Sequence, residues 1–251
     1  MYTKKQIQEI YKHAKLPPWG YRKFGLNLTP TNISNGFKGL KAIPDDHYDP
    51  IFKHPKDDES EMDIDKKRKQ CKNLKTIVPG KWLPATLDHL QLELDCIYPD
   101  LEICFVSALK SDGGGGQQGF HSDFGHHDFV RFAGLISFDD ETKLEIKTSG
   151  KNGKVSRTII NIQAGEAIVF RGDVFHAGSA YEKDNRRIYF KALPKGCSLK
   201  LDELDGVALG FVCDEAKGGC GEAFSFEKDL YNHCQNCAKW KNRSKKRKVH
   251  E

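Results

Sequence analysis

The feature that most constrains the fold of this 251-residue chain is a succession of short β-rich segments in its central part. They are rich in β-branched and aromatic residues, polar connectors separate most of them, and they span residues 101–109, 131–138, 143–148, 155–162, 166–170 and 186–193. Between two of them lies Asn152-Gly153, a pair that accepts the positive φ of a type I′ hairpin turn. The pattern predicts a mainly β domain, either a barrel or a sandwich.

Two helices are expected to flank this domain. Residues 3–14 have an amphipathic pattern that begins with a Thr3–Gln6 capping box and ends before Pro17-Pro18. Residues 83–97 place Pro84 in the first turn, and their apolar stripe consists of Leu87, Leu90, Leu94 and Ile97.

Two further stretches carry no such periodicity. Residues 19–55 are rich in turn-forming residues, and we predict an irregular segment there. Residues 56–72 contain an acidic run followed by a basic run with almost no apolar side chain, which predicts a solvated loop.

Candidate catalytic residues lie among the β-rich segments. His121 and Asp123 are two residues apart, so on a strand their side chains share one face. With His176 they would supply two imidazoles and one carboxylate, the ligand set of non-haem Fe(II) oxygenases. A second pair with the same spacing, His126 and Asp128, is the alternative.

A basic side chain follows on the last β-rich segment. Arg187 can bind a carboxylate through two parallel hydrogen bonds. Tyr189 and Lys191 share its face of the strand, so both are further candidates for contact with a bound co-substrate. Arg186 points to the opposite face and replaces Arg187 if the register differs by one residue.

Three motifs in this order, residues 117–123 (QQGFHSD), 172–178 (GDVFHAG) and 185–188 (NRRI), resemble the Fe(II)/2-oxoglutarate-dependent dioxygenase superfamily over roughly residues 100–195. The resemblance implies a double-stranded β-helix, also called a jelly-roll or cupin-like barrel. It also implies that His121, Asp123 and His176 bind iron, and that Arg187 binds 2-oxoglutarate. The expected reaction is hydroxylation coupled to the conversion of 2-oxoglutarate to succinate, with ascorbate as a candidate accessory cofactor.

The C-terminal part has the spacing of a small zinc-binding unit. Cys213, Cys220, His233 and Cys237 are the candidate ligands of a Cys2His2-type zinc finger in which Cys replaces the last His. The six residues between the first two Cys exceed the usual two to four, and Cys234 is an alternative ligand. We expect a structural zinc ion there.

The net positive charge of the chain is concentrated after this finger. Residues 239–251 contain seven Lys or Arg and one Glu, so the tail carries +6 while the whole chain carries +5. The KKRKV run at residues 245–249 resembles a nuclear-import signal, and it would also bind phosphates. Without a signal peptide or an apolar run of membrane-spanning length, we expect an intracellular, nuclear protein that does not bind membranes.

These observations divide the chain into a barrel domain with N-terminal helical support (1–200), a linker (201–210), the finger (211–238) and the basic tail (239–251). We expect an oxygenase with a macromolecular substrate, and the finger and tail favour nucleic acid over protein. The AlkB-type demethylases have a second Arg six residues after the Arg that binds 2-oxoglutarate, and at the corresponding position this chain has Leu193. The alternatives are a protein hydroxylase with the finger as a protein-contact module, and a non-enzymatic nucleic-acid-binding protein. Collagen-type prolyl hydroxylases have Lys at the position that binds 2-oxoglutarate, so Arg187 argues against membership in that group of protein hydroxylases.

Overall fold

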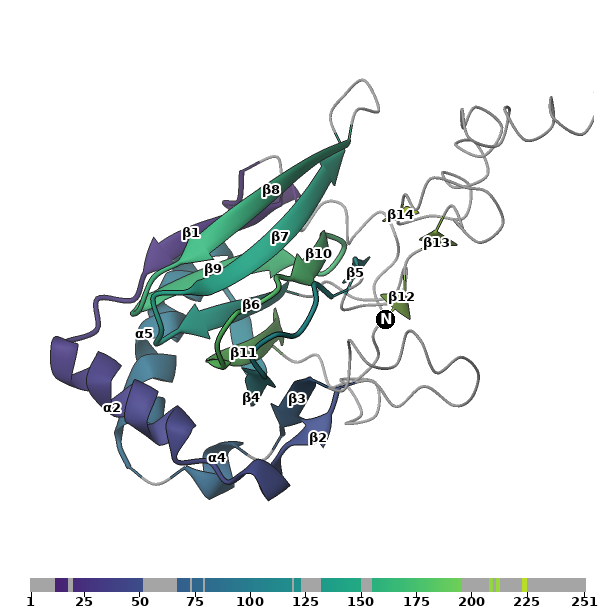
Figure 1. The fold of residues 1–251 in the computed structure, drawn as a ribbon. Helices are drawn as coiled ribbons and strands as arrows, with labels where there is room; N and C mark the ends of the chain where they lie inside the picture. The colour runs from purple at the N-terminus through teal and green to yellow at the C-terminus, as the bar shows by residue number, and fades with distance from the viewer. Residues whose placement is uncertain are drawn as a thin grey trace, which may run out of the picture.

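The computed structural model describes residues 12–17, 20–51, 67–72, 74–78, 80–118, 120–122, 132–149, 155–195, 208–209, 211–212 and 223–224. Their strands form two antiparallel sheets and a separate two-stranded pair. The major sheet has the order β1-β9-β6-β11-β4-β3-β2, and the minor sheet has the order β12-β5-β10-β7-β8 (Figure 1). The prediction of a mainly β domain with helices is confirmed.

The strands and helices have the following bounds. The major sheet contains β1 (Tyr21–Gly25), β2 (Asp49–Pro50), β3 (Arg68–Cys71), β4 (Leu101–Ser111), β6 (Phe132–Ser137), β9 (Glu166–Arg171) and β11 (Asn185–Pro194). The minor sheet contains β5 (His121–Ser122), β7 (Thr142–Ser149), β8 (Val155–Ile162), β10 (Phe175–Gly178) and β12 (Ala208–Leu209). The helical elements are α2 (Pro30–Lys41), η1 (Asp45–His47), α4 (Leu74–Ile77) and α5 (Trp82–Ile97), and β13 (Phe211–Val212) pairs with β14 (Ala223–Phe224).

Alternating side chains of the major sheet build two hydrophobic layers. On β11, Ile188 and Phe190 belong to the cluster that α2 and α5 cover, whereas Tyr189 belongs to the cluster between the two sheets. β6 and β9 alternate in the same way. Figure 1 shows α2 and α5 on one side of the major sheet and the β7–β8 hairpin on the other. The layer between the sheets is therefore where inward-facing side chains of β11 meet those of β5 and β10.

The helix predicted at 83–97 is confirmed as α5, with Leu90, Leu94 and Ile97 fully buried. The six predicted strands are confirmed as β4, β6, β7, β8, β9 and β11, within a few residues at each end. Of the N-terminal helix predicted at 3–14, only residues 12–14 are described; Lys12 and His13 are helical and Ala14 is buried in the core. No helix in the described part of the chain is long and apolar enough to cross a membrane.

The prediction that residues 19–55 are irregular is wrong, because they contain β1 and α2. The Thr29 side chain caps α2 by accepting a hydrogen bond from the Asn32 backbone at 3.2 Å, and Pro30 occupies the first helical position. Two glycines in α2 lower its helix propensity, so the sequence alone does not predict this helix. Gly36 gives room to the Phe138 ring, and a Cβ on Gly39 would lie 2.6 Å from the Trp82 indole nitrogen. Close helix packing thus outweighs poor helix propensity.

The predicted solvated loop at 56–72 and the predicted linker at 201–210 both contain strand residues. Arg68 and Cys71, the first and last residues of β3, are 2% and 0% exposed. Because β3 pairs with β4, this end of the charged run is a strand and not a loop. Residues 52–66 lie outside the described part of the chain. In the linker, Ala208 and Leu209 form β12 and extend the minor sheet next to β5.

Candidate active site

Two histidines face each other between neighbouring strands of the minor sheet. His121 of β5 is the register partner of His176 of β10, and both side chains are buried at 5% exposure. Their ring centroids lie 4.6 Å apart at an interplanar angle of 53°. Residues that are 55 positions apart in the sequence thus present two imidazoles at one point.

The His176 ring has its tautomer set by the backbone. Its Nδ1 lies 3.1 Å from the Val174 carbonyl oxygen, which can only accept, so Nδ1 is the donor and, in the neutral ring, Nε2 carries the lone pair. This is the arrangement in which a metal-binding histidine is held by its other nitrogen. Two imidazoles that share one ion at right angles, with metal–nitrogen bonds of about 2.1 Å, have ring centroids roughly 4–5 Å apart. The two histidines therefore fit a shared metal ion.

The third predicted ligand, Asp123, lies outside the described residues, as do the alternative pair His126 and Asp128. Among the residues that the structure describes, no three His, Cys, Asp or Glu side chains come together as a metal-binding group. The predicted finger ligands Cys213, Cys220, His233 and Cys237, with the alternative Cys234, also lie outside the described residues. The complete iron triad and the zinc site remain predictions.

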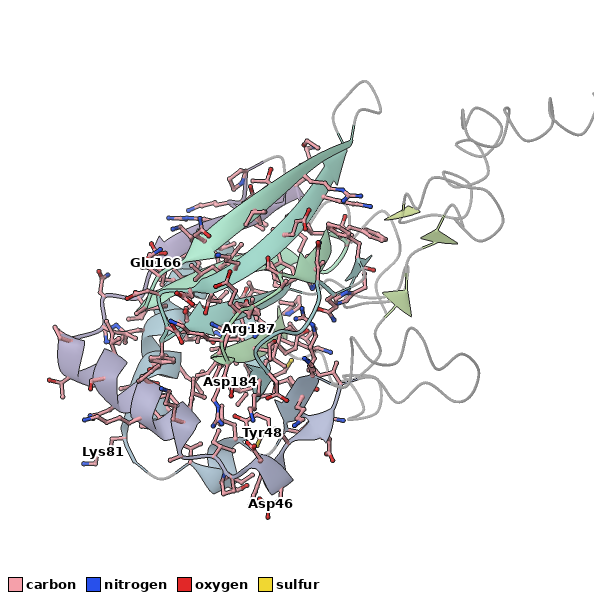
Figure 2. The ribbon with its side chains drawn as sticks, in the orientation of Figure 1. Asp46, Tyr48, Lys81, Glu166, Asp184 and Arg187 are labelled. Carbon is pink, nitrogen blue, oxygen red and sulfur yellow. The ribbon has the colours of Figure 1, made fainter. Side chains whose placement is uncertain are left out.

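Arg187, which is labelled in Figure 2, is a buried cation with an incomplete set of hydrogen-bond partners. It is 3% exposed, and its Nη1 donates to Ser111 Oγ and to Asn185 Oδ1, each at 3.1 Å. Its Cζ lies 5.4 Å from the centre of the Tyr181 ring. Its Nε is buried with no hydrogen-bond partner, and no carboxylate of the described residues pairs with it. A buried charge is costly unless an opposite charge compensates it, so this guanidinium is suited to an anionic ligand.

The histidines and Arg187 line one cavity of about 110 Å³ between the sheets. Tyr189 and Lys191, from the same face of β11, also line it, and Lys191 is 4% exposed. The other lining residues are Ile51, Gln70, Lys72, Leu109, Gln118, Leu135, Leu144, Phe170 and Gly178. The described lining contains three cationic side chains and no carboxylate. The cavity therefore combines two imidazoles, several apolar side chains and three cations.

Arg186 lies on the opposite side of β11 and does not reach this cavity. Its Nη1 donates to the carbonyl oxygens of Leu40 at 2.9 Å, Lys41 at 3.0 Å and Ile43 at 3.3 Å, at the C-terminal end of α2. A cation at this end of a helix satisfies carbonyls that have no partner within the helix. The structure thus contradicts Arg186 as a co-substrate ligand and gives it a structural role.

A second buried arginine beside the cavity was missed by the sequence analysis. Arg68 of β3 shares the Ser111 hydroxyl with Arg187, since Nη1 of Arg68 lies 3.5 Å from Ser111 Oγ. In the sequence it stands within a run of four basic residues, where nothing distinguishes it from a solvated surface charge. Only the pairing of β3 with β4 reveals its position.

No protein-family model and no curated protein sequence matches this chain. Solved structures do match its fold. The alpha-ketoglutarate-dependent carbocyclase SnoK from nogalamycin biosynthesis superposes with a TM-score of 0.56 at 10% identity, covering 90% of this chain and 94% of its own. The chain shares the fold of this enzyme. HygX from Streptomyces hygroscopicus, solved with nickel, 2-oxoglutarate and hygromycin B bound, gives 0.53 at 10% identity, covering 78% of this chain and 89% of its own.

A prolyl-4-hydroxylase from Pseudomonas putida gives a TM-score of 0.50 at 13% identity, covering 75% of this chain and 99% of that chain. Identities this low establish a shared fold and nothing finer. The jelly-roll architecture implied by the sequence motifs is consistent with these matches. The predicted zinc finger is not tested by them.

Proposed function

We propose that the chain is an Fe(II)- and 2-oxoglutarate-dependent dioxygenase, with His121, Asp123 and His176 as the iron ligands. The observation that carries the proposal is the buried Arg187, which has no acidic partner among the described residues yet lines the same cavity as both histidines. A dicarboxylate co-substrate would reach the metal with one end and Arg187 with the other. When bound, iron and 2-oxoglutarate supply the oxidising chemistry, in which dioxygen hydroxylates the substrate and 2-oxoglutarate leaves as succinate and carbon dioxide.

The side chains of this cavity have separate tasks in that reaction. His176 presents Nε2 because its Nδ1 proton is held by the Val174 carbonyl. Arg187 is aimed by Ser111 and Asn185, so it would neutralise a carboxylate without reorganising. Phe170, whose ring centroid lies 4.5 Å from that of His176, together with Leu135 and Leu144 keeps the metal side of the cavity apolar. Tyr189 and Lys191 are proposed as further co-substrate contacts.

For the substrate we propose a macromolecule, with nucleic acid favoured over protein. The support is the sequence of the C-terminal part, in which a zinc-finger pattern precedes a tail of net charge +6 that would also serve as an import signal into the nucleus. Zinc in the finger and ascorbate as an accessory cofactor are part of this proposal. A protein hydroxylase that uses the finger as a contact module is the alternative.

A small-molecule oxygenase is the second candidate function. HygX was solved with hygromycin B bound, and SnoK belongs to nogalamycin biosynthesis, so this fold also serves low-molecular-weight substrates. Because fold alone does not determine function, the two classes have to be separated by experiment.

The test is turnover of 2-oxoglutarate by the Fe(II)-loaded full-length chain. Succinate should form, and addition of single-stranded or duplex oligonucleotides should increase succinate and give a product heavier by one oxygen atom. His176→Ala should abolish succinate formation, because one metal ligand is lost. Undiminished succinate from His176→Ala would reject this site, and oxygen transfer to a protein extract but not to oligonucleotides would reject the nucleic-acid substrate.

A further inference from the structure

Arg68 lies where the two sheets meet beside the candidate active site. Its Nη2 donates to three backbone carbonyl oxygens, those of Gly116, Gly178 and Ser179, each at 2.9 Å. The side chain belongs to β3 of the major sheet, whereas Gly178 ends β10 of the minor sheet. With 2% exposure, the guanidinium is a buried link between the sheets.

The carbonyls that Arg68 binds belong to the two segments that carry the histidines. Gly116 stands five residues before His121, and Gly178 stands two residues after His176. Gln118 joins the same segments, because its backbone N–H donates to the Gly178 carbonyl at 2.9 Å and its Oε1 accepts from the Gly178 N–H at 3.1 Å. Arg68 and Gln118 together therefore fix the loop before β5 against the end of β10.

The same guanidinium also contacts the group that orients Arg187. Nη1 of Arg68 lies 3.5 Å from Ser111 Oγ, and that oxygen accepts a hydrogen bond from Arg187 Nη1 at 3.1 Å. Ser111 is 3% exposed, so water does not compete freely for its hydroxyl. One side chain thus contacts both the segments that carry the two histidines, through backbone carbonyls, and the hydroxyl that orients Arg187.

Gly178, which has no side chain, leaves the space that the Arg68 guanidinium occupies. A Cβ on Gly178 would overlap Arg68 Nη1 and would lie 3.1 Å from Gln118 Oε1. A lysine at position 68 would keep the charge, but an ammonium group has no planar fork with which to reach three carbonyls and a hydroxyl together.

We propose that Arg68 is a positioning residue, which sets the separation of His121 and His176 and the direction of Arg187. The inference rests on the proposed function, since it concerns the affinity of the same cavity for a metal ion and 2-oxoglutarate. Within the basic run at residues 66–69, Arg68 therefore has a positioning role that its neighbours in the sequence do not share. Arg68 itself touches neither ligand; it acts through Gly116, Gly178 and Ser111.

The experiment compares Arg68→Lys with Arg186→Lys in the full-length chain. Both arginines donate to three backbone carbonyls, but only Arg68 does so beside the cavity. Binding of Co(II) is followed by its visible absorption, binding of 2-oxoglutarate to the Co(II) form by calorimetry, and folding by the melting temperature. Arg68→Lys should weaken Co(II) binding about tenfold or more, as loss of groups that orient metal ligands does. Arg186→Lys should lower the melting temperature and leave both affinities unchanged.

Two further variants separate the arms of the network. Ser111→Ala should weaken 2-oxoglutarate binding and spare Co(II) binding, because it removes the hydroxyl between Arg68 and Arg187 but leaves the bonds from Arg68 to the backbone carbonyls in place. Gly178→Ala, which displaces the Arg68 guanidinium without removing it, should reproduce the loss of Co(II) affinity even if Arg68→Lys does not fold. Wild-type affinities in Arg68→Lys, or equal losses in Arg68→Lys and Arg186→Lys, would overturn the inference while leaving the proposed function intact. A wild-type chain that binds no Co(II) would instead overturn the proposed function and this inference with it.

Discussion

Two arginines that are adjacent in the sequence have opposite structural roles. Arg187 points between the sheets with its Nε unpaired, and Arg186 points toward α2 and satisfies three carbonyls. The alternation of side chains along β11 accounts for the difference, because neighbouring residues of a strand face opposite sides. The structural contacts of Arg186 and the proposed ligand binding of Arg187 thus belong to different members of one Arg-Arg pair.

Replacing Arg187 should weaken 2-oxoglutarate binding without lowering the stability of the fold. Arg187→Met should weaken 2-oxoglutarate binding by about 2–3 kcal/mol, because a desolvated charge pair is lost. Without ligand, the variant should melt no lower than the wild type, since an apolar side chain removes a buried cation that lacks an acidic partner. Calorimetry and thermal unfolding measure both effects.

Arg186→Met is the matched control, with the reverse outcome. It should melt at a lower temperature, because the C-terminal carbonyls of α2 lose their donors, and it should bind 2-oxoglutarate as the wild type does. Weakened 2-oxoglutarate binding in Arg186→Met with normal binding in Arg187→Met would show that the facing of β11 is misassigned.

At the scale of elements, an ion-pair cluster joins β4 to η1 on the side away from the cavity. Nζ of Lys110 donates to Asp45 at 2.8 Å and lies 3.0 Å from Asp112 Oδ1. Burial alone would lower the pKa of Lys110, but its hydrogen bonds with Asp45 and Asp112 raise the pKa above the ordinary value. Burial would raise the pKa of Asp112, yet Lys110 and Lys69 hold it below the ordinary value. Nearby, burial raises the pKa of Tyr48 to about 12.

These shifts predict a pH-dependent contribution to stability. The depressed carboxylate pKa stabilises the fold above about pH 4 and the benefit is lost as the pH falls through the folded-state value, while the raised Lys110 pKa stabilises the fold below about pH 10. Lys110→Met should therefore lower the free energy of unfolding by about 1 kcal/mol at neutral pH, and by less below pH 4. Urea unfolding at several pH values measures this, and a difference independent of pH would contradict it.

The elements that the sequence predicts well are those with strong periodicity. α5 buries apolar side chains at helical spacing, so pattern alone locates it. β3 and α2 were missed because tertiary contacts stabilise them: Arg68 is buried by hydrogen bonds, and the glycines of α2 are required by Phe138 and Trp82. The candidate residues His121, His176 and Arg187 could be named from their order in the chain, whereas Arg68 and Ser111 could not, since only strand pairing brings them together.

At the scale of the whole molecule, the positive tail and the cavity are separate features of one chain. Removal of residues 211–251 retains β12, so it should leave Co(II) and 2-oxoglutarate binding unchanged while weakening binding to DNA or RNA. If all seven cations of the tail contact duplex phosphates, the logarithm of the affinity should fall with the logarithm of salt concentration with a slope of about −6. Fluorescence anisotropy with labelled duplexes measures this slope. A flat salt dependence in the full-length chain would leave the tail with an import role only.

The pairing of β12 with β5 has a consequence for the order in which the protein matures. Leu209 is the register partner of His121, and β5 has β12 on one side and β10 on the other. A chain that emerges from the ribosome can complete the major sheet once β11 is available, but β5 gains its second neighbour only after residue 209 has been synthesised. The strand that carries the first histidine is thus completed only when residues 208–209 are available, and synthesis that stops before residue 208 leaves a sheet edge open beside the cavity.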